Sequence, residues 1–165
     1  VAQPFSAFGL SPVHLRPDGR GTVRLKSADP LAAPEIRFNF LKTASDWEAM
    51  LKGMAICREI GKQAALKPFV VEEIMPGASV TEDGALRDYL RETGVSNLHP
   101  VGTCRMGREP DAVVDPQLRV HGIAGLRVAD ASIMPSIVAG NTNAPSIMIG
   151  EKCADMVRAA ATQAA

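Results

Sequence analysis

Three stretches in the second half of the chain place polar residues in settings that could support chemistry. In the first of them, His99 stands directly before Pro100. A proline restricts the backbone of the residue before it to extended conformations, so this arrangement would hold an imidazole still at the mouth of a site. A histidine that only makes a hydrogen bond within a loop is the simpler alternative on local grounds.

The second stretch, residues 126–132, has the pattern of a short strand that ends in Asp130 and Ser132. An acidic residue at a strand end can hold a cofactor hydroxyl group, or it can cap the turn that follows. Capping is the simpler of these two alternatives.

The third stretch, residues 140–145, leads into the last helix that the sequence predicts. A helix start offers unpaired N–H groups and the positive end of the helix dipole, which suits an anion or a developing negative charge. Asn143 is explained as the N-cap of this helix. Asn141 is not needed for capping, so it is the freer candidate for contact with a ligand.

Other common chemistries do not fit the residues present. His99, Cys104 and His121 do not follow the spacing of a zinc site, and we expect no metal. The serines lack the strand–GxSxG–helix setting of a hydrolase nucleophile. The sequence contains neither a GxGxxG motif nor a Walker-type glycine loop, so it carries no usual motif for anchoring a dinucleotide.

Short strands and one terminal helix are expected to surround these stretches. Residues 21–27 and 36–40 alternate apolar and polar side chains, which predicts two half-buried strands in an antiparallel sheet with one solvated face. Asn143 and Pro145 predict the start of the last helix. The stripe expected to be buried on this helix consists of Ile149, Cys153, Met156, Val157 and Ala160.

Two helices are predicted in the middle of the chain. Residues at helical spacing predict a helix over 46–63, and Ser45 with Glu48 forms a capping-box signature at its start. A shorter helix is expected over 83–93, with Gly94 placed to end it. The expected stripe of the longer helix consists of Trp47, Met50, Leu51, Met54 and Arg58, with Trp47 in the core.

The length and composition are those of a globular chain of 165 residues with 46% hydrophobic and 22% charged residues. The 18 basic and 18 acidic residues balance, which leaves no electrostatic footprint for nucleic acid or an anionic membrane. No apolar run approaches the roughly 20 residues of a bilayer span. Three widely spaced cysteines favour a reducing compartment, and we predict a cytoplasmic location. The opening residues fit neither a signal peptide nor a start at methionine, so we expect a piece of a longer protein.

Taken together, several motifs resemble the C-terminal part of the glucose–methanol–choline (GMC) family of flavin-dependent alcohol oxidoreductases. The resemblance covers nearly the whole chain and is closest to the choline dehydrogenase and oxidase branch. The motifs are RGTVRL at 20–25, SADP at 27–30, HPVGTCRMG at 99–107, VDP at 114–116, GLRVADASIMP at 125–135, GNTN at 140–143 and IGEK at 149–152.

This resemblance implies an α+β fold and FAD as cofactor. Residues 1–110 would supply most of a substrate-binding domain, an antiparallel sheet with helices packed on one face. Residues 111–165 would complete the FAD-binding domain and the active site, with the last helix aimed at the flavin. The glycine loop of the family lies in an N-terminal FAD-binding half that this sequence lacks, so that half is an expected partner.

The resemblance also implies roles for residues near the reacting atoms. His99 matches the family's active-site histidine, which would accept the alcohol's hydroxyl proton as hydride leaves for flavin N5, a role that suits an imidazole near neutral pH. Asn141 matches a second catalytic position, where an amide can hydrogen-bond the substrate oxygen but cannot take its proton. Asn97 is expected to face the substrate as well.

Four further residues match positions that contact the cofactor. Asp130 and Ala131 would touch the ribityl–pyrophosphate region of FAD. Thr142 and Asn143 would place backbone N–H groups near flavin N1 and O2, where negative charge gathers on reduction. This agrees with the local argument that a helix start stabilises such charge.

The leading hypothesis is therefore the catalytic part of a flavin-dependent oxidoreductase that converts a primary alcohol to an aldehyde. An isolated, non-catalytic structural or interaction module that needs a separate FAD-binding half is the alternative. A third possibility is a member of the family that has lost activity, although the presence of both His99 and Asn141 argues against it. Choline recognition would need an aromatic or acidic cage, and the sequence has only one Trp and one Tyr.

Overall fold

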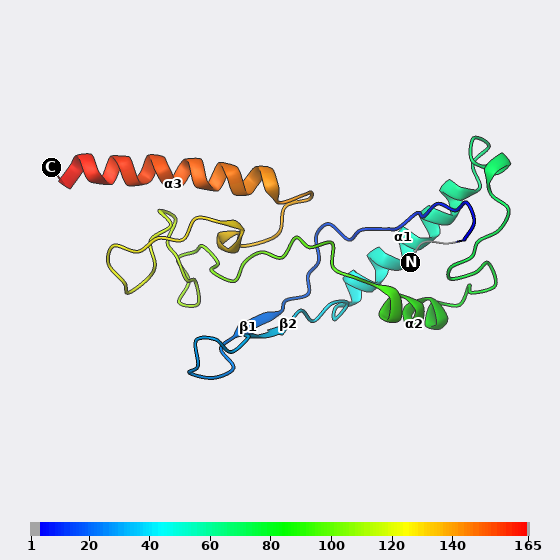
Figure 1. Ribbon diagram of the computed structural model, residues 1–165, viewed down its shortest axis with the longest axis horizontal. Coiled ribbons are helices and arrows are strands. Elements are labelled where there is room, and N and C mark those ends of the chain that lie inside the picture. Colours follow the sequence, from blue (N-terminus) through cyan, green and yellow to red (C-terminus); the bar gives the residue numbers. More distant parts are fainter. Residues whose placement is uncertain (1–3, 165) are drawn as a thin grey trace. The chain divides into compact units, whose positions relative to one another are not determined.

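The computed structural model describes residues 4–164, whose contacts gather into two compact units (Figure 1). Unit 1 comprises the residues up to Gly19 together with Asn39–Asn97, and unit 2 comprises Arg20–Phe38 together with the residues from Leu98 onward. Within residues 4–164 there are three α-helices and one two-stranded antiparallel sheet, which confirms the α+β composition. The predicted division into domains 1–110 and 111–165 stays a prediction.

The sheet belongs to unit 2 and is formed by β1 (Thr22–Arg24) and β2 (Glu35–Arg37). The strands pair antiparallel as predicted, with Val23 opposite Ile36. Both strands are shorter than predicted, and β2 ends before Asn39, whose φ of 54° is incompatible with an extended strand. The expected burial of one face is wrong for this chain, since Val23 is 49% and Ile36 52% exposed. A two-stranded sheet needs a further layer to cover a face.

Unit 1 is built on α1 (Ala44–Gly61) and α2 (Asp83–Thr93), with a short 3-10 helix η1 (Lys67–Phe69) between them. The bounds predicted for α2 are confirmed, and those for α1 differ by two residues at each end. Gly94 ends α2 as predicted, and its N–H donates to the Leu90 carbonyl at 2.9 Å.

The predicted cap of α1 is wrong. The N-cap is Thr43, whose Oγ1 accepts a hydrogen bond from the Asp46 N–H at 3.1 Å. The Ser45 hydroxyl lies within the first turn and donates instead to Asp18 Oδ2 at 2.5 Å. The local pattern predicted that the Ser45 hydroxyl caps the helix, but this hydroxyl instead bonds Asp18, which lies 27 positions away in the sequence.

The apolar core of unit 1 lies between α1 and α2. Its buried residues are Trp47, Met54, Leu86 and Leu90, which confirms the core position of Trp47. The guanidinium groups of Arg87 and Arg91, one turn apart on α2, each lie 4.9 Å from the centroid of the Trp47 ring. Cation–π attraction therefore adds to apolar burial in holding α2 on α1.

Asp46 is a buried carboxylate at the start of α1, with only 1% of its surface exposed. Its Oδ1 lies 3.1 Å from His14 Nε2 and accepts the Asp18 N–H at 3.0 Å. Burial alone would raise the pKa of Asp46, but the polar groups of Thr43, Asp18 and His14 outweigh that effect and lower it below the ordinary value. Asp46 thus ties the segment containing His14 and Asp18 to the positive end of α1.

Unit 2 contains α3 (Asn143–Ala164) and the 3-10 helix η2 (Ala131–Ile133). The buried core of this unit consists of Val114, Leu118, Ile133, Met134 and Ile149. The predicted stripe of α3 is confirmed for Ile149, Cys153 and Met156, which pack in or against this core. It is wrong for Val157, which is 49% exposed, and for Ala160, which is also exposed. Val157 lies about 100° around the helix from Met156 and so faces away from the core.

The cysteines and the helices bear on the expectations drawn from composition. Cys57, Cys104 and Cys153 are all free thiols. Over residues 4–164, none of the helices combines the length and the apolar character that crossing a bilayer requires. The cellular compartment stays a prediction.

Candidate active site

The imidazole of His99 meets the residue that starts α3. His99 Nδ1 lies 2.9 Å from Thr142 Oγ1, although the two residues are 43 positions apart in the sequence. His99 is partly buried, and its backbone is constrained on both sides. Pro100 follows it, and Leu98 before it has a φ of 60°, a left-handed conformation that costs a leucine about 1–3 kcal/mol. The chain thus accepts local strain where it presents this histidine.

The segment after His99 is fastened to η2 by backbone hydrogen bonds. The N–H of Cys104 donates to the Ser132 carbonyl at 2.9 Å, and that of Met106 donates to the Ile133 carbonyl at 2.8 Å. Gly102 in this segment has a φ of 87°, a left-handed conformation that favours glycine. The His99 segment therefore moves with the core of unit 2, to which Ile133 belongs.

Asp130 acts as the cap of η2. Its side chain accepts the Ser132 N–H at 2.7 Å, which confirms the capping alternative. The contacts of Asp130 and Ala131 with FAD stay predictions. Ala131, the first residue of η2, is partly buried. Within residues 4–164 the Ser132 hydroxyl oxygen is buried and has no hydrogen-bond partner. This orphaned polar atom marks a place where a polar group could be received.

The start of α3 differs by one position from the predicted cap. The Thr142 carbonyl accepts the Ser146 N–H at 3.1 Å, the first bond of the helix, so Thr142 occupies the cap position. Asn143 is then the first helical residue and Pro145 the third. The Ser146 hydroxyl adds a second hydrogen bond to the Thr142 carbonyl at 2.6 Å.

The two remaining asparagines differ in their relation to this site. Asn141 is exposed and directly precedes Thr142, so it stands beside the residue that contacts His99. Asn97 is exposed and is the last residue of unit 1, whereas His99 belongs to unit 2. The role expected for Asn97 at the site stays a prediction.

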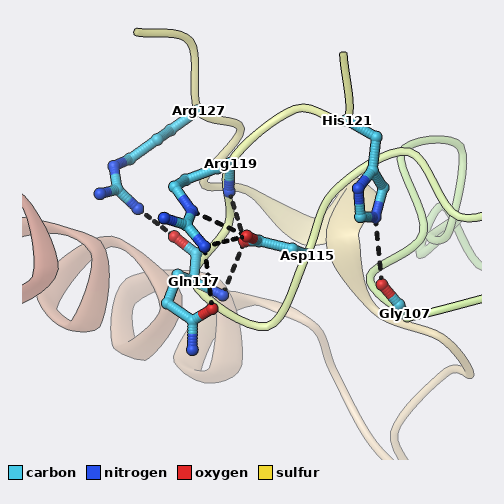
Figure 2. A network of polar contacts seen from close by, with 6 residues as sticks. All are labelled: Gly107, Asp115, Gln117, Arg119, His121 and Arg127. Atoms are coloured by element: carbon cyan, nitrogen blue, oxygen red, sulfur yellow. Dashed lines mark hydrogen bonds and ion pairs between the residues drawn. The ribbon is translucent and has the colours of Figure 1, made fainter. Parts of the chain in front are cut away.

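A polar network, to which the sequence motifs gave no role, joins Asp115, Gln117 and Arg119 within one loop (Figure 2). Asp115 accepts the N–H groups of Gln117 and Arg119 at 2.8 and 2.9 Å and the Arg119 Nε–H at 2.7 Å. Burial would raise the pKa of Asp115, but its bonds with Arg119 and Gln117 prevail and lower it. The Asp115–Pro116 turn and the arginine four positions after Asp115 were the signal available in the sequence.

This network supports the core under the site. Arg127 Nη1 donates to the Gln117 carbonyl, which joins the turn to the next stretch of chain (Figure 2). The turn is flanked by Val114 and Leu118, both fully or almost fully buried against Ile133. The Asp115–Arg119 pair thus fixes the turn that carries Val114 and Leu118, which pack against Ile133 of η2. The backbone of η2 in turn binds the segment that follows His99.

Comparisons with known proteins all match this chain to the C-terminal part of one protein family. A family model described as GMC oxidoreductase, for the C-terminal part, matches residues 17–150. The oxygen-dependent choline dehydrogenases of Pseudomonas fluorescens and Klebsiella pneumoniae are each 49% identical to this chain over 144 residues. That alignment covers 87% of this chain but only 25% and 26% of the two relatives. The chain therefore spans about a quarter of the length of these curated relatives.

Solved structures agree with this assignment. Pyridoxine 4-oxidase from Mesorbium loti has a TM-score of 0.81 and 33% identity, over 86% of this chain and 28% of that one. A fungal aryl-alcohol oxidase has a TM-score of 0.77 and 34% identity, over 87% of this chain and 24% of that one. The extent of the family match, together with these similarities, shows that this chain belongs to the GMC oxidoreductase family and corresponds to its C-terminal part.

Proposed function

We propose that this chain supplies the catalytic, substrate-side part of an FAD-dependent oxidoreductase that converts a primary alcohol to an aldehyde. The observation that carries the proposal is the 2.9 Å approach of His99 Nδ1 to Thr142 Oγ1, which brings an imidazole to the first turn of a long helix. A proton acceptor and a positively polarised helix end are the two groups that this oxidation needs beside a flavin. The similar proteins, which include a choline dehydrogenase and an aryl-alcohol oxidase, support this substrate class.

The polar groups of unit 2 fit a flavin dinucleotide. The first turn of α3 has N–H groups at Asn143 and Ala144 without helical partners, and these suit the electron-rich edge of an isoalloxazine ring. The buried Ser132 hydroxyl, which has no hydrogen-bond partner in the part of the chain that the structure describes, lies in η2 next to Ala131 and two residues after Asp130, where it suits the polar ribityl–pyrophosphate region. Bound FAD would supply the acceptor for the hydride that leaves the alcohol carbon.

The residues of this chain would then divide the remaining work. As the C–H bond breaks, the alcohol O–H proton passes to His99, and the carbon–oxygen bond becomes a carbonyl. The Asn141 amide would donate a hydrogen bond to the same oxygen and hold the alcohol in place. An amide has no basic lone pair near neutral pH, so His99 is the only base in this scheme. Asn97 is proposed as a further contact to the substrate.

The remaining part of the enzyme would come from a FAD-binding half. We propose that this half covers the face of the β1–β2 sheet on which Val23 and Ile36 lie half exposed. The β1–β2 sheet would then form part of a larger sheet with helices on one face. In that arrangement residues 1–110 belong to the substrate domain and residues 111–165 complete the FAD domain. The absence of a dinucleotide loop from this sequence supports the need for such a half.

The test is His99→Ala in the flavoprotein formed with the FAD-binding half. Turnover of primary alcohols should fall by a factor on the order of 10²–10⁴, the usual contribution of a general base, while the FAD content stays unchanged. His121→Ala is the matched control, because His121 is an exposed histidine of the same unit, and the one hydrogen bond of its ring among residues 4–164 is to the Gly107 carbonyl, at 3.2 Å. Turnover near the wild-type rate in His99→Ala would rule out His99 as the base.

A further inference from the structure

We propose, building on the function above, that Thr142 is a positioning residue that fixes the protonation state of the two His99 ring nitrogens. In this arrangement the Nδ1–H of His99 donates to Thr142 Oγ1. The lone pair of Nε2 is then the one available to take the substrate proton. Thr142 would thus act through its hydroxyl group as well as through its backbone.

The Thr142 hydroxyl makes no capping hydrogen bond to its own helix among the described residues, and one of its two usual partners is missing. The side chain of a capping Thr normally accepts the N–H of the second or third helical residue. The third residue of α3 is Pro145, which has no N–H. Within residues 4–164, the contact with His99 Nδ1 is the only hydrogen bond of this hydroxyl. A residue type that usually stabilises its own helix is directed to the histidine instead.

The hydroxyl is also held at a fixed place. The Thr142 carbonyl accepts both the N–H and the hydroxyl of Ser146, at 3.1 and 2.6 Å. The same helix is anchored one turn later by Ile149, which is 6% exposed and lies in the core with Ile133. Because η2 also fastens the segment that follows His99, both partners of the 2.9 Å contact are attached to one core.

The constraint on the His99 backbone does not by itself orient the ring. The ring torsion of a histidine is broad and nearly two-fold, so Pro100 and Leu98 leave both ring orientations open. A hydrogen bond to one nitrogen selects an orientation and, in a neutral imidazole, also decides which nitrogen keeps a lone pair. Nε2 has no hydrogen bond among the described residues, which leaves it open to a substrate.

The alternative arrangement has the opposite chemical consequence. If the Thr142 hydroxyl donated to Nδ1, the ring proton would sit on Nε2, and that nitrogen could give a hydrogen bond but could not accept a proton. A base that removes the hydroxyl proton therefore requires Thr142 to be the acceptor. The two arrangements can be distinguished by a measurement that does not depend on activity.

The first test is nitrogen NMR of the flavoprotein labelled with ¹⁵N-histidine, with the His99 signals assigned from His99→Gln. We expect Nδ1 of the neutral ring to show the shift of a protonated, pyrrole-type nitrogen and Nε2 that of an unprotonated, pyridine-type nitrogen. In Thr142→Val this preference should weaken or reverse, and in Thr142→Ser it should return. A pyridine-type Nδ1 in the wild-type protein would overturn the proposal.

The second test is kinetic and uses the same variants. Thr142→Val should lower kcat about tenfold, the worth of one hydrogen bond, with little change in KM, and Thr142→Ser should restore most of it. Thr43→Val is the control for the loss of a capping hydroxyl, because Thr43 caps α1 in unit 1 and should leave the His99 signals unchanged. If His99→Ala is slow but Thr142→Val keeps wild-type kcat and the same ring signals, the positioning role is wrong while the proposed function stands. If His99→Ala is itself fast, the proposed function fails first.

Discussion

Replacing Gly102 with alanine should loosen the segment that carries His99, by an amount that the backbone geometry defines. Gly102 has a φ of 87°, and a Cβ atom built on it would lie 3.1 Å from the carbonyl oxygen of Met134. Met134 is 5% exposed and belongs to the core of unit 2, so its carbonyl cannot move away freely.

Two opposing effects set the size of the change. A left-handed conformation costs an L-residue about 1–2 kcal/mol, while replacing glycine lowers the entropy of the unfolded chain and returns about 0.4–1 kcal/mol. The close contact with the Met134 oxygen adds roughly 1 kcal/mol of overpacking. We expect Gly102→Ala to lower the free energy of unfolding by about 2 kcal/mol.

Two other glycines separate these effects. Gly122 has a φ of 77° but no atom within 4 Å of an added Cβ, so Gly122→Ala should cost only about 1 kcal/mol. Gly150 lies inside α3 with open space around it, so Gly150→Ala should stabilise the chain by about 0.5–1 kcal/mol. From the most to the least stable, the expected order is therefore Gly150→Ala, wild type, Gly122→Ala and Gly102→Ala.

The assay is urea unfolding followed by circular dichroism, combined with hydrogen exchange. Exchange at the amides of Cys104 and Met106, which donate to η2, should accelerate in Gly102→Ala and stay unchanged in Gly150→Ala. The reasoning is refuted if Gly102→Ala is as stable as wild type, or if Gly122→Ala costs as much as Gly102→Ala.

Three further predictions concern the core, the buried carboxylate and the cofactor. Ile149→Ala should lower the free energy of unfolding by about 2–5 kcal/mol, because it opens a cavity between α3 and η2, and a loss below 1 kcal/mol in urea unfolding would contradict this packing. Asp46 has a lowered pKa, so its stabilising effect is complete above the ordinary value of 3.8 and is lost as the pH falls through the lower folded-state value. The stability advantage of wild type over Asp46→Asn, followed by Trp47 fluorescence, should therefore shrink between neutral pH and about pH 3, and an advantage that grows on acidification would be the wrong sign. The purified chain alone should be colourless, since it has no dinucleotide loop, and a flavin absorption band retained through purification would contradict the need for a FAD-binding half.

The sequence predicted the elements whose signals are local. The bounds of α2 follow from the spacing of its apolar residues and from Gly94, and the capping role of Asp130 follows from its place before a turn. The start of α1 was misassigned because both Thr43 and Ser45 can cap a helix. The Ser45 hydroxyl donates a hydrogen bond to Asp18, and no local sequence pattern predicts this contact.

The candidate site was predictable mainly from the family resemblance. His99 and Thr142 are 43 residues apart, and nothing in their local sequence indicates that a hydroxyl at the helix start meets the imidazole. The exposure of Val23 and Ile36 could not be predicted either. Alternation in a strand indicates that one face is covered, but it does not indicate which part of a protein covers that face.

Chemical rescue by imidazole addresses the base directly. In the flavoprotein that carries His99→Ala, anaerobic mixing with a primary alcohol should bleach the flavin band slowly. Added free imidazole should then accelerate bleaching in proportion to its concentration, with no such effect in wild type or in His121→Ala. Rapid bleaching of His99→Ala without imidazole, or slow bleaching that imidazole leaves unchanged, would contradict the assignment of the His99 ring as the acceptor of the alcohol proton.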